Sequence, residues 1–274
     1  MREIVKLALA EDRVGQDVTT LALEDFDRIV TAEVTAKAAG VMSGLDVFTE
    51  TYMMVDPTVE VRKLKNDGDE VGHAEAVAEI RGAESSILKA ERTALNFLQQ
   101  LSGVATWTRQ FVQKIKAYNV SLLDTRKTVP GMRYLQKKAV RDGGGSNHRL
   151  NLEDMAMVKD NHIRMAGTIT RAVQLVRKRF PAKRVEVEVK NLEELAEALS
   201  LEVDMIMLDN FDLPLVKEAV RMTNRRAKLE VSGNVTLDNI EEKAKTGVDF
   251  ISVGALTHSF SSLDFSLNIR IDSR

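Results

Sequence analysis

The side chains that could do chemistry are concentrated between Asp124 and His162. This stretch gathers cations and two histidines around a glycine run: Arg126, Lys127, Arg133, Lys137, Lys138, Arg141, Arg149, Lys159, His148, His162 and Gly143 to Gly145. The whole chain has a formal net charge of only -2, so this positive charge is local. Cationic side chains and backbone amides beside glycine bind small ligands that carry several negative charges. We therefore expect a site for a small polyanion.

Composition excludes several classes of protein. The 274 residues contain no cysteine, which rules out disulfides, thiolate metal sites and a cysteine nucleophile. The near-neutral charge argues against nucleic-acid or membrane-surface binding. No apolar run approaches the roughly 20 residues of a membrane span, and the charged N-terminal segment is typical of a short amphipathic helix rather than a signal peptide. We expect a cytoplasmic protein.

The first part of the chain predicts an antiparallel α+β domain. Alternating or apolar segments suggest strands at Ile29–Lys37, Val59–Leu64 and Ala76–Ile80. Helical periodicity follows from Ser85 to Tyr118, and we expect Gly103 to separate two helices there. We therefore expect a division near Gly103, into an α+β domain over residues 1–102 and a second domain over residues 103–274, whose C-terminal tail can pack back on the first domain.

After Tyr118 short apolar runs alternate with amphipathic helices, which predicts a parallel sheet or barrel. The runs are Val120–Leu123, Met155–Val158, Val185–Val189, Met205–Leu208, Leu229–Val231 and Phe250–Val253. We expect helices to begin after Asn191, Asp212 and Thr236, and the last to end at Gly247. A complete eight-stranded α/β barrel takes roughly 250 residues, so the roughly 155 that remain favour six or seven strands.

Polar or glycine residues lie at or next to the ends of these runs: Asp124, Lys159, Glu188, Asp209, Ser232 and Gly254. In a parallel barrel they all fall at the C-terminal mouth, where barrel enzymes keep their chemistry. Arg126 and Lys127 directly follow the first run, where a guanidinium suits a carboxylate or phosphate. We therefore place the polyanion site at the mouth rather than in an ordinary solvated loop.

Several of these residues allow more than one interpretation. Lys159 either pairs with a neighbouring acid, binds an anionic ligand, or forms a Schiff base. Glu188 and Asp209 suit Mg²⁺ or sugar hydroxyls, while a salt bridge to Lys159 is the structural alternative. The loops after the last two strands suit phosphate. His258 and Arg92 carry no pattern of their own that marks them as functional.

Taken together, these residues resemble the quinolinate phosphoribosyltransferase family, the carboxylating nicotinate-nucleotide pyrophosphorylases of NAD biosynthesis. The resemblance covers nearly the whole chain, and its motifs come in the family's order. It is strongest in Asp124-Thr125-Arg126-Lys127-Thr128 with Pro130-Gly131, in Gly143-Gly144-Gly145 with Asn147-His148-Arg149, and in Lys159 with Asn161-His162. Further motifs are Glu91-Arg92-Thr93-Ala94-Leu95-Asn96, Glu186 to Val189, Leu208-Asp209-Asn210, Ser232-Gly233-Asn234 and Ser252-Val253-Gly254-Ala255.

The resemblance implies an N-terminal α/β sandwich, an incomplete seven-stranded TIM-like barrel, and a homodimer with shared active sites, a higher oligomer being left open. It implies a Mg²⁺-dependent reaction of quinolinate with phosphoribosyl pyrophosphate, which gives nicotinate mononucleotide, pyrophosphate and CO₂. Neither nucleic acid nor membrane is an implied partner.

The resemblance also implies roles for individual residues. Lys127, Lys159, Glu188 and Asp209 would be catalytic, the two acids also holding ribose hydroxyls and Mg²⁺. The implied substrate-binding residues include Arg92, contributed by the partner subunit, residues that contact quinolinate, and residues of the phosphate-binding loops. They are Arg92, Thr125, Arg126, His148, Arg149, Ser232, Gly233, Asn234, Val253, Gly254, Ala255 and His258. Arg126, His148 and Arg149 would hold the two quinolinate carboxylates.

Three other functions remain open at this point. A paralogous pyrophosphorylase of molybdate-transport loci would act on a different substrate. A Schiff-base aldolase would use Lys159 as its nucleophile. A non-catalytic sensor would bind phosphoribosyl pyrophosphate without needing the dicarboxylate-binding arginines.

Overall fold

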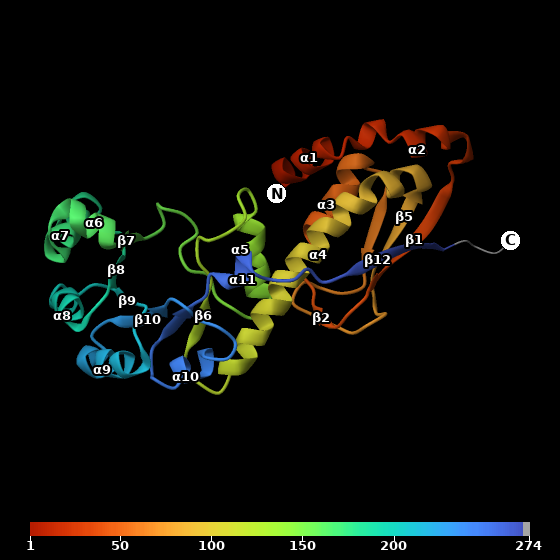
Figure 1. Ribbon diagram of the computed structural model, residues 1–274. Coiled ribbons are helices and arrows are strands. Elements are labelled where there is room, and N and C mark those ends of the chain that lie inside the picture. Colours follow the sequence, from red (N-terminus) through yellow and green to blue (C-terminus); the bar gives the residue numbers. More distant parts are fainter. Residues whose placement is uncertain (271–274) are drawn as a thin grey trace. The chain divides into compact units, whose positions relative to one another are not determined.

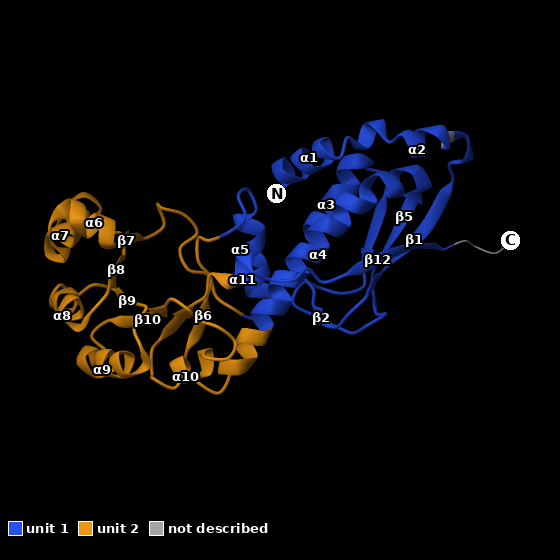
Figure 2. Ribbon diagram, viewed as in Figure 1, with its two compact units in different colours: residues 1–109, 128–144, 256–274 blue, residues 110–127, 145–255 orange. Residues whose placement is uncertain are grey.

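The computed structural model describes residues 1–270 and folds into two compact units (Figure 2). Unit 1 comprises residues 1–109, 128–144 and the described residues from 256 onward, and unit 2 comprises residues 110–127 and 145–255. The division expected between Ser102 and Gly103 lies within one long helix, α4 (Glu84–Ile115). No helix in residues 1–270 is long and apolar enough to cross a membrane.

Unit 1 is built on a four-stranded antiparallel sheet in the order β12-β1-β5-β3 (Figure 1). Its strands and those of a small second sheet are β1 (Ile29–Ala36), β3 (Glu60–Lys63), β5 (Ala76–Ala83), β12 (Phe265–Arg270), β2 (Gly40–Val41) and β4 (Glu70–Val71). Its helices are α1 (Arg2–Glu11), α2 (Val18–Ala22), α3 (Leu45–Val55), α4 up to Arg109, and α5 (Arg133–Asp142), with short 3-10 turns η1 (Val14–Gln16) and η2 (Glu24–Phe26).

The core of unit 1 lies between this sheet and helices α3 and α4. Phe48 and Tyr52 of α3 are fully buried, with ring centroids 5.1 Å apart in an edge-on arrangement. They belong to one cluster with Val34 and Ile80 of the sheet and Leu98 of α4. The alternation that predicted the strands is therefore confirmed, because its apolar positions face this cluster.

Strand β12 was not predicted by the sequence analysis. It pairs antiparallel with β1 over six residues, from Ala36 opposite Phe265 to Thr31 opposite Arg270. Phe265, Leu267 and Ile269 alternate with polar residues and pack on the core, so the period-two pattern of a half-buried strand was present and was overlooked.

The expectation that Gly103 separates two helices is wrong, because α4 runs through it without interruption. A Cβ atom at Gly103 would lie 2.4 Å from the carbonyl oxygen of Ser261 and 2.8 Å from the Cα atom of Ser262. The glycine is thus explained by the close approach of the backbone that leads into β12.

Unit 2 contains a parallel sheet in the order β6-β11-β10-β9-β8-β7, as the apolar runs predicted. Its strands are β6 (Ser121–Leu123), β7 (Ala156–Val158), β8 (Val185–Val189), β9 (Met205–Asp209), β10 (Lys228–Ser232) and β11 (Phe250–Ser252). The connecting helices include α6 (Asp160–Ala166), α7 (Ile169–Arg179), α8 (Leu192–Ser200), α9 (Leu213–Thr223) and α10 (Ile240–Ala244), and α11 (Ala255–His258) follows β11.

A seventh strand is reduced to one parallel bridge, between Leu123 and Ser146. The Ser146 N–H donates to the carbonyl of Leu122 at 2.8 Å, and the Asp124 N–H donates to that of Ser146 at 3.1 Å. The segment that begins at Ser146 therefore takes the place of a strand beside β6 in an incomplete TIM-like barrel.

Two of the three expected helix starts in unit 2 are confirmed. The side chain of Asn191 accepts the N–H of Glu194, and that of Asp212 accepts the N–H of Leu215. The expectation for Thr236 is wrong, because its N–H donates to the Asn239 side chain in a turn and α10 begins only at Ile240. The same helix ends at Ala244, before Gly247.

The contact at Gly103 predicts the sign of a stability change. An alanine in an unhindered helix is favoured over glycine by about 1 kcal/mol. Gly103→Ala should instead lower the free energy of unfolding by about 1–3 kcal/mol, because two backbone atoms obstruct the new methyl group. Urea unfolding measures the change, and Gly15→Ala, which meets nothing within 4 Å, is the control. A stabilised Gly103→Ala protein would contradict this account.

Candidate active site

A cavity of about 410 Å³ opens at the C-terminal ends of the unit 2 strands. Its lining includes many of the residues that sequence analysis singled out: Thr125, Arg126, Lys127, His148, Arg149, Lys159, Glu188, Asp209 and Ser232. Met157, Met207, Glu230 and Ser252 complete it. The predicted cations and acids thus share one pocket.

Strand alternation explains why these side chains converge. Met207 and Asp209 of β9 are two residues apart, as are Glu230 and Ser232 of β10, so each pair shares a face of the sheet. The register places Glu230 opposite Met207 and Ser232 opposite Asp209. The inward side chains therefore form two levels, and the upper level contains the polar strand ends.

Lys159, which directly follows β7, and Glu188 of the neighbouring strand β8 form an ion pair at the cavity. The Lys159 Nζ atom lies 2.7 Å from Glu188 Oε2, with the lysine side chain 41% exposed and the glutamate 11%. The salt bridge considered as the structural alternative is therefore present. It holds the ammonium group at the cavity wall, where an anionic ligand could also reach it.

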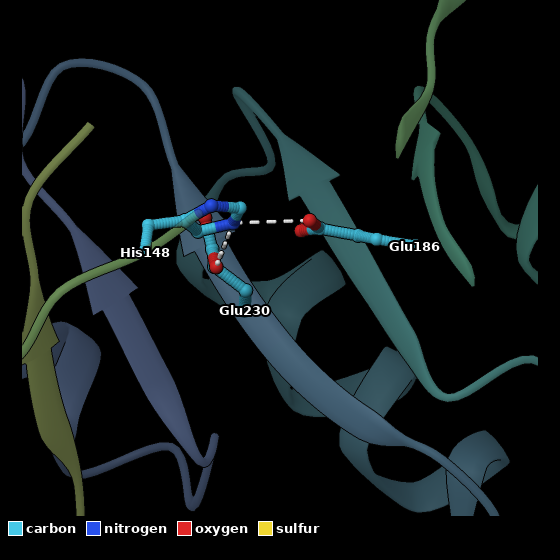
Figure 3. Close-up of side chains that lie close together, drawn as sticks. All are labelled: His148, Glu186 and Glu230. Atoms are coloured by element: carbon cyan, nitrogen blue, oxygen red, sulfur yellow. Dashed lines mark ion pairs between the residues drawn. The ribbon is translucent and has the colours of Figure 1, made fainter. Parts of the chain in front are cut away.

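His148 lies between two glutamates that are completely buried (Figure 3). Its Nε2 atom is 3.0 Å from Glu186 Oε2 and 3.3 Å from Glu230 Oε2. Burial alone would lower the pKa of His148, but the two carboxylates outweigh burial and raise the pKa to about 9. Burial also raises the pKa of the Glu230 carboxyl.

The other ring nitrogen constrains the tautomer of His148. Nδ1 accepts the backbone N–H of Arg149 at 2.7 Å, which requires a lone pair on Nδ1 and so opposes full protonation. The raised pKa and this bond thus act in opposite directions on the ring charge. In both protonation states Nε2 carries its proton toward the carboxylates.

The backbone of this segment is anchored by Asp124, which is fully buried at the end of β6. One oxygen of Asp124 accepts the N–H of His148 at 2.9 Å, and the other accepts the side-chain amide of Asn147 at 2.6 Å. Arg149, also buried, donates to the carbonyl of Met155 at 3.1 Å. Burial, together with the positive charge of Arg126, lowers the pKa of Arg149.

Sequence analysis did not single out Glu186 or Glu230 as site residues. Both are flanked by apolar residues on either side, and an acid in that position is easily read as an outward-facing residue. The available signal was the two-residue spacing, since Glu186 precedes Glu188 and Glu230 precedes Ser232 by two positions. A residue two positions before a mouth residue points to the same interior.

The loops expected to bind phosphate follow β10 and β11. Gly233 has φ of 93°, and a Cβ atom there would lie 2.1 Å from Asn210 Oδ1. Asn234 has φ of 49°, a left-handed conformation that asparagine tolerates better than most residues. After β11, the Val253 N–H is already bonded to the Leu123 carbonyl at 2.9 Å, while Gly254 and Ala255 are partly exposed.

Arg92 and His258 belong to unit 1, so they do not line the unit 2 cavity. Arg92 is exposed, with Glu91 at 4.0 Å, and lines a separate cavity of about 600 Å³ with Asn96. His258 is exposed and contacts the Ser259 hydroxyl at 2.8 Å.

The expectation that the Gly143–Gly145 run offers its amides to an anion is wrong for its first two members. The N–H groups of Gly143 and Gly144 bond to the carbonyls of Ala139 and Arg141 at the end of α5. A Cβ atom at Gly143 would lie 2.4 Å from the carbonyl oxygen of Ala105. The first two glycines therefore serve helix termination and packing.

The sequence comparisons agree on one protein family. Family models for the C-terminal and N-terminal domains of quinolinate phosphoribosyl transferase match residues 104–268 and 17–102. A probable nicotinate-nucleotide pyrophosphorylase (carboxylating) of Synechocystis is 46% identical over 85% of this chain and 81% of its own length. The chloroplastic nicotinate-nucleotide pyrophosphorylase (carboxylating) of Arabidopsis thaliana is 41% identical over 98% of this chain and 82% of its own length.

Solved structures agree in fold. The nicotinate-nucleotide pyrophosphorylase from Francisella tularensis superposes with a TM-score of 0.94 at 43% identity, covering 98% of this chain and 95% of that one. The corresponding protein from Ehrlichia chaffeensis gives 0.92 at 38% identity, covering 98% of both chains.

The anchoring role of Asp124 predicts a loss of stability without a change of shape. Asp124→Asn replaces one acceptor oxygen by an NH₂ group, which then faces either the His148 N–H or the Asn147 amide. The free energy of unfolding should fall by about 1–3 kcal/mol, the cost of a buried unsatisfied donor. Chemical denaturation measures it. Asp154→Asn is the control, because that exposed side chain accepts only the Leu150 N–H and the asparagine oxygen can replace it. Equal effects of both substitutions would contradict the anchoring role.

Proposed function

The chain belongs to the quinolinate phosphoribosyltransferase family, and we propose that it transfers the phosphoribosyl group of phosphoribosyl pyrophosphate to quinolinate. The products are nicotinate mononucleotide, pyrophosphate and CO₂. The main support for this function is the lining of the unit 2 cavity, which combines four cations with two acids: Arg126, Lys127, Arg149, Lys159, Glu188 and Asp209. Quinolinate is a dianion and the second substrate bears phosphate at both ends, so both require such cations.

We assign quinolinate to the wall formed by Thr125, Arg126, His148 and Arg149. The Nε atom of Arg126 is buried and has no hydrogen-bond partner in residues 1–270. A buried donor without a partner is costly, and a substrate carboxylate would supply the missing acceptor. Arg149 beside it supplies a second guanidinium for the second carboxylate.

We assign the pyrophosphate and ribose to the opposite wall. Lys127 and Lys159 would contact the departing pyrophosphate, while Glu188 and Asp209 accept hydrogen bonds from the ribose hydroxyls. Two partly exposed carboxylates on adjacent strands also fit Mg²⁺, which prefers oxygen ligands and retains several waters. When bound there, Mg²⁺ would neutralise charge on the pyrophosphate. The loops at Ser232–Asn234 and Val253–Ala255 would receive the 5′-phosphate, with His258 beside the second loop.

The proposed reaction has two steps. The pyridine nitrogen of quinolinate forms a bond to the anomeric carbon of ribose as the bond to pyrophosphate breaks. Lysines near that oxygen stabilise its developing charge more in the transition state than in the ground state. The alkylated ring nitrogen is cationic, so it stabilises the carbanion that remains when the adjacent carboxylate leaves as CO₂. A proton on that carbon completes nicotinate mononucleotide.

The alternative functions receive less support. Schiff-base chemistry needs a neutral amine, whereas Lys159 faces Glu188 at 2.7 Å in an arrangement that suits an ammonium group. The paralogous enzyme of molybdate loci is disfavoured by the names of the relatives, which include quinolinate phosphoribosyltransferases from Nicotiana species.

We further propose a homodimer in which Arg92 of one subunit enters the cavity of the other. Arg92 is exposed in unit 1, and its guanidinium pairs with Glu91 only over a long distance of 4.0 Å. An exposed arginine of this kind is available to a ligand held by a second copy.

The proposed reaction is tested directly with purified protein. Quinolinate, phosphoribosyl pyrophosphate and Mg²⁺ should give equal amounts of nicotinate mononucleotide and CO₂, measured by chromatography and by release of label from the 2-carboxylate. Nicotinate in place of quinolinate is the matched substrate control, and a chelator should stop the reaction. The proposed function fails if neither product forms with quinolinate.

Subunit mixing tests the shared site. An Arg92→Ala subunit and an Arg126→Ala subunit should each be nearly inactive alone. Equal mixing after reversible dissociation should restore about a quarter of wild-type activity, because half of the dimers are mixed and each has one intact site. Mixing Arg92→Ala with a Lys89→Ala, Arg92→Ala double variant is the control and should restore nothing. Absence of recovery in the first mixture would refute supply of Arg92 across subunits.

A further inference from the structure

We propose that Glu186 and Glu230 are positioning residues, which hold the imidazole of His148 so that the quinolinate subsite is formed before substrate arrives. This inference rests on the proposed function. It adds two residues that act through His148 rather than on the substrate itself: Glu230, which reaches the cavity lining, and Glu186, which is not part of it.

The first argument is that the cluster contains more acceptors than folding requires. One Nε2–H group needs one acceptor, yet two carboxylates lie 3.0 and 3.3 Å from Nε2 of His148. Glu186 and Glu230 are both completely buried in strands whose neighbouring residues are apolar. Burying two carboxylates is expensive, and apolar side chains of similar volume often replace buried ion pairs without loss of stability. A purely structural role therefore does not explain the second acid.

The second argument is the weak attachment of the segment that carries His148. Its link to the sheet is a single bridge at Ser146, after which Asp124 holds the His148 N–H. These contacts fix the backbone, and the ring itself is held at Nδ1 by the Arg149 N–H and at Nε2 by the two glutamates. Glu186 reaches the ring from β8 and Glu230 reaches it from β10, so two separate strands restrain it (Figure 3).

The third argument is the position of the ring relative to the arginines. His148, Arg149 and Arg126 all line the cavity, and Glu230 reaches its wall as well. The Arg149 N–H bonds to Nδ1 of the same ring, so ring orientation and the course of the chain at Arg149 are coupled. A rotated imidazole would disturb both the His148 and the Arg149 contributions to dicarboxylate binding.

The proposal is tested with three variants of the full-length enzyme. Glu186→Leu together with Glu230→Leu removes both acceptors, while Glu186→Gln and Glu230→Gln each retain an acceptor oxygen. Glu193→Gln, an exposed acid on α8, is the control. The double leucine variant should raise KM for quinolinate about 10-fold or more and change KM for phosphoribosyl pyrophosphate less than about 2-fold. The glutamine variants should stay close to wild type.

A second readout does not depend on activity. The chain has only four histidines, so the side-chain Nε2–H signal of His148 can be assigned by NMR from its loss in His148→Gln. In the wild type this proton should exchange slowly with water, and in the double leucine variant its signal should vanish while the thermal midpoint shows that the protein is folded. If the enzyme does not act on quinolinate but the signal behaves in this way, the proposed function fails and the restraint of the ring stands.

Three results would overturn the proposal. One is a slowly exchanging His148 proton that persists in the double leucine variant. Another is an equal rise of KM for both substrates, which would indicate general damage to the barrel. The last is stoichiometric binding of Zn²⁺ that shifts the His148 signals in the wild type but not in the double leucine variant. The possible ligand atoms of His148, Glu186 and Glu230 lie within 4.8 Å of one another, so this result would show that they form a metal site.

Discussion

The organisation of the candidate site depends on carboxylates buried inside a parallel sheet. Asp124, Glu186 and Glu230 come from three different strands, and each accepts a hydrogen bond from, or pairs with, the segment that carries Asn147 and His148. That segment has no ladder of its own, because its link to β6 is a single bridge. Asp124 thus accepts a backbone N–H that a strand ladder would otherwise have bound, while Glu186 and Glu230 hold the His148 side chain.

These buried carboxylates also affect the electrostatics of the cavity. A pocket that must bind two polyanions needs several cations, which would repel one another in the empty protein. Glu188 beside Lys159 supplies compensating charge, and Glu186 and Glu230 place two further carboxyl groups against His148. The cations can therefore be assembled in advance, so that less reorganisation is required when the substrates bind.

Sequence patterns gave the strands of unit 2 well, because each is a short apolar run followed by a polar residue. They failed where the reason for a residue lies in distant packing. Gly103 was read as a helix break, but the backbone at Ser261 explains it. Gly143 was read as an anion loop, but it packs on Ala105. Glu186 and Glu230 were missed as site residues because local patterns do not distinguish an inward acid from an outward one. The ligand roles of the predicted site residues remain predictions.

The pairing of β1 with β12 has a consequence for synthesis of the protein on the ribosome. Thr31 pairs with Arg270, so β1 waits for a segment far later in the sequence before its sheet is complete. Until β12 has emerged, one edge of β1 has open hydrogen-bonding groups, which invite pairing with other nascent chains. Contacts of such sequence separation also slow folding. The sheet of unit 1 therefore cannot be completed before β12 has left the ribosome.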